Sequence, residues 1–164
     1  MASAQKRSLL DQLIAKLQHE ADTLISAAKA AHEAATHEES RSEDKHDTRG
    51  LEASYLAGAQ ADRAAQLQTL ISAYRMMALK DFDAGDPVAP GALVELVQLE
   101  TERRSRYLVV ERGGGATLSM DGQTVQVIGP QSPLGEAMMG RRVDEEFEVE
   151  AQGGVREYKV QSIQ

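Results

Sequence analysis

The stretch DFDAGDPVAP, residues 81–90, divides the sequence into two halves with different hydrophobic periods. Its two prolines, one glycine and three aspartates end any helical pattern, because proline cannot continue a helix and glycine weakens one. Alanine, leucine, glutamine and glutamate dominate the residues before it, whereas alternating apolar residues and turn signals dominate those after it. The sequence therefore predicts a helical part at residues 1–80, a linker at 81–90 and a sheet-containing part at 91–164.

The helical part carries two apolar stripes with steps of three and four residues, the spacing that places side chains along one side of an α-helix. The first stripe comprises Leu10, Leu13, Leu17, Ala21, Leu24, Ala28, Ala31 and Ala35. The second comprises Leu56, Gln60, Arg63, Leu67, Leu70, Tyr74 and Met77, two of which are polar. Each stripe needs a partner, so we expect two antiparallel helices that pair as a coiled coil.

The sheet-containing part consists of short alternating segments separated by turn signals. Residues 121–122 (Asp-Gly) and 153–154 (Gly-Gly) have the composition of hairpin turns. Between two strands, Ser132 can cap a short helix, Pro133 can be its first residue and Gly140 can end it. The expected fold class is α+β, with an antiparallel two-helix coiled coil followed by an antiparallel sheet and one short helix.

Composition and charge exclude several classes of protein. The chain has no cysteine, which excludes disulfides, thiolate metal sites and a cysteine nucleophile, and which fits a cytoplasmic location. We find no signal peptide and no apolar run long enough to span a membrane. The formal charge is −8, and residues 81–164 hold 8 basic against 15 acidic residues. Such a surface does not favour direct nucleic-acid binding, which depends on lysine and arginine.

Two motif-like patterns do not support a catalytic site. His32, Glu33 and His37 resemble a zinc protease motif, but the histidines are five residues apart, whereas that motif needs them four apart on one helical face. Three glycines at 113–115 lack the Lys-Ser/Thr of a phosphate-binding loop, so a turn between strands is expected. No histidine occurs in residues 81–164 to act as the base of a Ser/His/Asp arrangement.

Acidic residues gather where the two predicted helices must reverse direction, near residues 38–52. The candidates are Glu43, Asp44, Asp47 and Glu52. One interpretation is a solvated loop. The other is a site for Mg²⁺, with Asp44 and Asp47 as ligands. Because one pair of carboxylates seldom forms a complete Mg²⁺ site, the ion would be shared with phosphates or with another protein. No cofactor is therefore expected to bind the isolated chain.

The two-helix part followed by VQVIGPQSPLGEAMMGRRVDEEFEVEAQGGVREYKVQSI resembles the bacterial GreA/GreB transcription elongation factors. The most specific segments are SPLG at 132–135 and GRRV at 140–143. The resemblance implies an FKBP-like C-terminal domain that docks on RNA polymerase and a coiled coil that enters the secondary channel. It also implies an accessory factor rather than an enzyme, which contacts nucleic acid only through the transcription complex. Separately, we expect no membrane contact and a monomeric protein.

In the cleavage-stimulating members of this family, acidic residues at the tip help to hold the second Mg²⁺ of the polymerase, which promotes cleavage of backtracked RNA. Their tip reads Asp-x-x-Glu-Asn-Ala-Glu-Tyr. With that tyrosine placed on Tyr55, the three carboxylates fall on Thr48, Leu51 and Ser54, so none is retained. Either Asp44 and Asp47 replace them, or the coiled coil modulates elongation or pausing without strong cleavage; the altered tip favours modulation.

Residues on and after the predicted short helix are the candidate polymerase-binding set, because methionine and arginine are frequent in protein interfaces. The set is Ser132, Pro133, Leu134, Gly135, Met138, Met139, Arg141 and Arg142. Packing of the helix on the sheet explains at least one of the two methionines equally well. The alternative function is an FKBP-like prolyl isomerase or chaperone, but residues 81–164 contain four aromatic residues, which are few for such a pocket.

Overall fold

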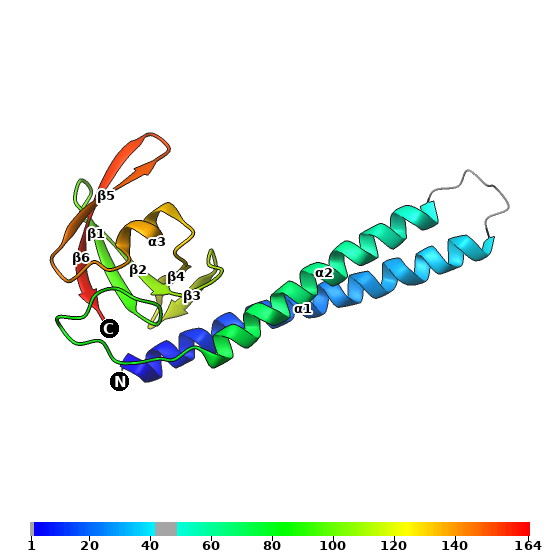
Figure 1. Ribbon diagram of the computed structural model, residues 1–164, viewed down its shortest axis with the longest axis horizontal. Coiled ribbons are helices and arrows are strands. Elements are labelled where there is room, and N and C mark those ends of the chain that lie inside the picture. The colour runs from blue at the N-terminus through cyan, green and yellow to red at the C-terminus, as the bar shows by residue number, and fades with distance from the viewer. Residues whose placement is uncertain (1, 42–48) are drawn as a thin grey trace. The chain divides into compact units, whose positions relative to one another are not determined.

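The computed structural model of the chain describes residues 2–41 and 49–164 (Figure 1). Its elements are α1 (Ala2–Arg41), α2 (Arg49–Met76), β1 (Leu93–Gln98), β2 (Arg103–Val109), β3 (Thr117–Met120), β4 (Gln123–Ile128), α3 (Pro133–Met138), β5 (Glu146–Ala151) and β6 (Gly154–Ile163). They form two compact units, one of residues Ile14–Arg75 and the other of Met1–Leu13 with Met76–Gln164.

The first unit is a helical hairpin in which α1 and α2 lie alongside each other (Figure 1). The stripe predicted on α1 is confirmed, since all eight of its residues are buried or half-buried. Alanine at positions 21 and 35 is almost fully buried, which allows close approach of the two helices. The expected antiparallel pair of long helices is therefore present.

The stripe predicted on α2 is partly wrong: at positions 56 and 63 the next residue along the chain is buried instead. Leu67 and Tyr74 are buried as expected, but Leu56 is 54% exposed, and Ala57 is buried in its place. Arg63 also lies outside the buried stripe, where its guanidinium is 3.7 Å from Glu20. In each of the pairs 56/57 and 63/64, either residue has a spacing that could place it against the other helix, so spacing alone does not decide which one is buried. Packing selects the smaller alanine because it admits the neighbouring helix.

The second unit contains a six-stranded sheet with strand order β3-β4-β2-β1-β6-β5. All neighbouring pairs are antiparallel except β2 and β4, which are parallel, so the sheet is mixed rather than wholly antiparallel. The parallel pair arises because β3 and β4 form a hairpin whose second strand lies beside β2. Asp121 and Gly122, at φ 52° and 75°, form the predicted turn of that hairpin.

Helix α3 packs on one face of the sheet, as expected. Met138 is completely buried there, in a core that also contains Leu96, Val109, Val160 and Phe147. Strand register places Leu96 and Val160 side by side, and side chains alternate between the two faces along each strand. The core therefore lies between α3 and one face of the sheet.

The first turns of α1 belong to the same unit as the sheet, although the sequence analysis grouped residues 1–80 together. The side-chain amide of Gln12 donates to the carbonyl of Ser119 at 3.0 Å and accepts from its N–H at 3.2 Å. Gln12 thus satisfies backbone groups of β3, a strand at the edge of the sheet. Such a contact joins residues far apart in sequence, so local periodicity does not reveal it.

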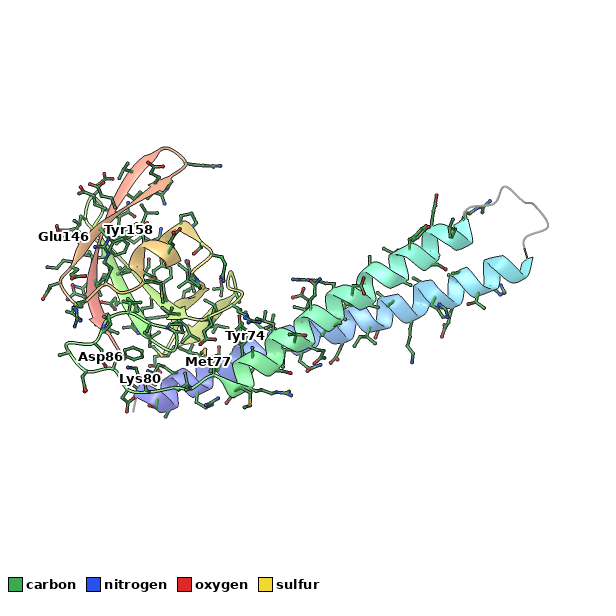
Figure 2. All side chains as sticks on the ribbon, viewed as in Figure 1. Tyr74, Met77, Lys80, Asp86, Glu146 and Tyr158 are labelled. Carbon is green, nitrogen blue, oxygen red and sulfur yellow. The ribbon has the colours of Figure 1, made fainter. Side chains whose placement is uncertain are left out.

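The segment after α2 is also packed rather than loose. Lys6 has no exposed surface; its ammonium donates to the carbonyl of Lys80 and lies 4.9 Å from the centroid of the Phe82 ring. Burial lowers the pKa of Lys6, and the nearby carboxylate of Asp81 opposes that effect. Figure 2 shows Lys80 and Asp86 in this segment, where their charged groups are 3.6 Å apart. Residues 81–90 therefore contribute contacts as well as a connection.

Candidate functional site

Residues 132–142 contain all eight side chains that the sequence analysis predicted to bind polymerase. Ser132 is the N-cap of α3, with φ −86° and ψ 149°; its hydroxyl accepts from the N–H of Gly135 at 3.1 Å and donates to the carbonyl of Gly129 at 3.1 Å. Pro133, the first residue of the helix, is exposed. Ser132 thus fixes the start of α3 and joins it to the loop after β4, so the position of Pro133 is defined by its neighbours.

Gly135 is required by close backbone approach. A Cβ atom at this position would lie 1.9 Å from the carbonyl oxygen of Gly129, far inside van der Waals contact. Gly129 is constrained in the same way, because its own Cβ would lie 2.3 Å from the carbonyl oxygen of Gly113. The glycines of the 113–115 loop, the β4 end and α3 therefore form one closely packed set, which the sequence analysis did not connect.

The apolar members of the candidate set differ in exposure. Met138 is fully buried and packs in the core, so in this structure it supports the helix and has no surface to offer a partner. Leu134 and Met139 are partly buried against the same core. The packing explanation therefore holds for Met138, while Leu134 and Met139 retain surface that a partner could contact.

The two arginines after α3 are exposed, and each is oriented by contacts. The guanidinium of Arg141 donates to the carbonyl of Ala137 at 3.2 Å and lies 5.6 Å from the centroid of the Phe147 ring. The guanidinium of Arg142 donates to the carbonyl of Gly85. These contacts leave part of each side chain accessible, so both arginines remain candidates for a contact surface.

An open cleft of about 860 Å³ lies beside this segment, on the part of the sheet face that α3 does not cover. Residues 113–115, Ser132 and Leu134 line one side, and residues of β1, β2, β4, β5 and β6 line much of the rest. The aromatic residues among those that line it are Tyr107 and Tyr158. Burial raises the pKa of the Tyr107 phenol above its ordinary value. Figure 2 shows Tyr158, which stacks on Phe147 with ring centroids 5.8 Å apart.

This cleft was not predicted from the sequence, although the alternation of side chains along the strands contains part of the signal for it. Gln98 is opposite Arg103 on β2 and opposite Tyr158 on β6, so these three side chains form one row across the sheet. Finding that row needs the strand order and register as well as the alternation. Neither is fixed by residues near one another in the sequence.

The acidic candidates of the tip are mostly outside the described residues. Glu43, Asp44 and Asp47 fall within 42–48, which the structure does not describe. Glu52 is exposed in the first turn of α2, where a carboxylate suits the positive end of the helix dipole. Leu51, beside it, is 53% exposed. Over residues 2–41 and 49–164, no three His, Asp or Glu side chains gather closely enough to hold a metal ion.

The helical hairpin has a shallow groove of about 780 Å³ lined mainly by small residues of both helices. His32 and Glu33 line it, together with Gly58 and several alanines. Within the described residues, no helix is both long enough and apolar enough to cross a bilayer.

Comparison with known proteins gives a family match over the sheet unit. Residues 83–164 match the family model described as "Transcription elongation factor, GreA/GreB, C-term". The chain is 30% identical over 102 residues to transcription elongation factor GreA of Xylella fastidiosa, covering 62% of this chain and 61% of that one. It is 32% identical over 81 residues to GreA of Mesorhizobium japonicum, covering 49% and 48%. The chain thus spans less than two thirds of these GreA relatives.

A longer match is to transcription inhibitor protein Gfh1 of Thermus aquaticus, 26% identical over 153 residues, which covers 93% of this chain and 90% of that one. The crystal structure of Thermus aquaticus Gfh1 is 25% identical and covers 96% of this chain and 94% of that one, with a TM-score of 0.41.

Proposed function

This chain belongs to the GreA/GreB family, and from that premise we propose that it is a transcription elongation factor that acts on bacterial RNA polymerase. The observation that carries the proposal is the family match at residues 83–164, next to a hairpin of two long helices. In this proposal the sheet unit docks on the polymerase, and the hairpin enters the secondary channel that leads to the active site. The curated relatives are named as transcription factors, which supports an accessory role rather than an enzymatic one.

Docking would use the exposed side chains that α3 and the following loop hold in place. Pro133, Arg141 and Arg142 are exposed, and the neighbouring backbone is fixed by the Ser132 cap. Gly135 and Met138 would contribute indirectly, since they set the position of α3 from within the unit. A surface held this way loses little conformational entropy on binding, which favours affinity.

The tip supports modulation of elongation or pausing rather than strong stimulation of RNA cleavage. Leu51 is largely exposed where the family's cleavage factors carry a carboxylate, and a hydrocarbon side chain provides no ligand for a hard cation. Ser54 is half-buried and lines the hairpin groove instead. The match to a protein named a transcription inhibitor covers 93% of this chain, whereas the GreA matches reported above cover 62% or less. That difference supports the same conclusion.

Cleavage would need a carboxylate to improve occupancy of the second Mg²⁺, which activates water and stabilises the leaving oxygen. The remaining candidates for that role are Asp44 and Asp47, with the ion shared with the polymerase. We propose that these two carboxylates do not bind the ion strongly, because Lys45 and Arg49 lie among them in the sequence and offset their negative charge.

The cleft does not favour the alternative of a prolyl isomerase or chaperone. Tyr107 and Tyr158 are the aromatic side chains among its lining residues, and glutamine and arginine are prominent in the remainder. Pockets for small apolar groups are lined mainly by hydrophobic and aromatic side chains. An isomerisation assay on a short proline peptide is expected to show only the uncatalysed rate.

The proposed function is tested with stalled, backtracked elongation complexes. Wild-type protein should bind core polymerase and change the rate of elongation or pausing, with little shortening of the transcript. The double variant Asp44→Ala/Asp47→Ala should behave in the same way. Rapid shortening by wild type that the double variant abolishes would replace modulation by cleavage stimulation, and no binding to polymerase would refute the proposal as a whole.

A further inference from the structure

Two arginines lie on the sheet face that forms the cleft. Arg103 is opposite Gln98, and Arg156 is opposite Val149, which belongs to the core on that face. Both arginines line the cleft and are exposed. Because side chains alternate along a strand, Arg104 lies on the opposite face, where it pairs with Glu95 at 3.4 Å. Register therefore brings two guanidinium groups from distant segments to one cleft.

These two arginines differ from the other basic residues of the sheet strands. Arg104 and Arg106 both pair with Glu95, and Lys159 lies 3.2 Å from Asp144. Within the described chain, neither the Arg103 nor the Arg156 guanidinium forms an ion pair, although residues 81–164 carry nearly twice as many acidic as basic residues. The cleft thus holds two guanidinium groups that form no ion pair within the described chain, although the unit as a whole is acidic. Glu150 is the one acidic residue among those that line the cleft.

We propose that this cleft binds an extended acidic segment of polypeptide, with Arg103 and Arg156 contacting its carboxylates. The arginines provide charge and bidentate geometry for carboxylates. The amides of Gln98 and Gln126 can hydrogen-bond to a main chain, and the partly buried Leu134 offers apolar surface. The volume of about 860 Å³ and the open form suit a few residues of chain rather than an isolated anion. This inference rests on the proposed function in assigning the segment to RNA polymerase.

The first experiment measures binding of the full-length chain to core RNA polymerase at several salt concentrations. Arg103→Glu/Arg156→Glu should weaken binding by about tenfold or more and remove part of its salt dependence. The matched control is Arg104→Glu/Lys159→Glu, which changes the net charge equally on the opposite face and should bind within about twofold of wild type. An equal loss in both variants would overturn the inference, because net charge rather than the cleft would then explain the effect.

The second experiment uses the isolated full chain, so it decides the inference even if polymerase binding fails. Isotope-labelled protein is titrated with the blocked peptide EPLEEPLE, with the same peptide carrying lysine for glutamate, and with a single-stranded RNA 12-mer. The acidic peptide should shift the resonances of Gln98, Gly113–Gly115 and Tyr158, and Arg103→Glu/Arg156→Glu should abolish those shifts. No shift with the acidic peptide, or an equal or larger response to the lysine peptide or the RNA at the same residues, would overturn it.

Discussion

Replacing Gly135 by alanine tests whether close backbone packing at the start of α3 holds the candidate docking surface in place. The new Cβ would lie 1.9 Å from the carbonyl oxygen of Gly129 and 2.8 Å from the Ser132 hydroxyl. Alanine normally favours a helix over glycine by about 1 kcal/mol. Overpacking against rigid neighbours costs about 1–3 kcal/mol or more, and here the closest neighbour is backbone that cannot rotate away. We therefore expect a net loss of about 2 kcal/mol in the stability of the sheet unit.

Gly58→Ala is the matched control, because it makes the same chemical change in α2. A Cβ there would meet nothing within 4 Å, and the residue is exposed. This variant should gain about 0.5–1 kcal/mol through lower chain entropy in the unfolded state and better helix propensity. The two substitutions should therefore have opposite signs.

The assay combines thermal unfolding followed by circular dichroism with hydrogen exchange of peptides that cover residues 129–140. For a unit of about 100 residues, a loss of about 2 kcal/mol corresponds to a fall of about 8–16 °C in Tm. The largest increase in exchange should be in the loop after β4 and in α3. Unchanged Tm and exchange in Gly135→Ala would refute the reasoning, since the backbone contact would then be easily relieved.

Four further predictions concern the hairpin and its base. Leu67→Ala should destabilise the hairpin by about 2–5 kcal/mol because Leu67 is buried, whereas Leu56→Ala should cost under about 0.5 kcal/mol in urea unfolding; equal effects would contradict the observed seam. Gln60→Leu should stabilise the hairpin by about 1–3 kcal/mol in the same assay, because the buried Gln60 Oε1 has no hydrogen-bond partner in the described chain; a loss would show that a partner exists. Burial raises the pKa of Tyr74 to about 12, so its contribution to the free energy of unfolding, on the order of 2–3 kcal/mol, is complete below about pH 10 and is lost between about pH 10 and 12; unfolding at pH 9 and 11.5 should show that loss, and Tyr74→Phe should lose less. Lys6→Met should be neutral or stabilising because it removes a buried charge whose pKa is lowered, and a large loss of Tm would show that the bond to the Lys80 carbonyl outweighs desolvation.

Local chemistry in the sequence was sufficient for the elements and several of their ends. The change of period at residues 81–90 separates the helical and sheet patterns, and the helix cap at Ser132 and the turn at Asp121 occur where their residue types predict. These features depend on neighbours within a few residues, so the sequence reports them directly. The α1 stripe is also correct, since all eight of its residues are buried or half-buried.

Features that depend on distant partners were not predicted. The choice of Ala57 over Leu56 reflects how closely two helices approach, and the burial of Lys6 requires the segment after α2 to fold back on the first turns of α1. The parallel pairing of β2 with β4 and the row from Arg103 to Tyr158 follow from strand order. Among the predicted docking residues, burial separates Met138 from the exposed arginines, and spacing alone could not make that distinction.

The most direct test of the account places a photo-crosslinking amino acid at Leu51, an exposed position in the first turn of α2, and forms complexes with core RNA polymerase. A control protein carries the same group at Val155, which is exposed on β6. We expect the Leu51 crosslink to map to the channel or active-site region of the polymerase, whereas the Val155 crosslink, if one forms, should map to its outer surface. Binding with a Leu51 crosslink only on the outer surface would contradict insertion of the hairpin.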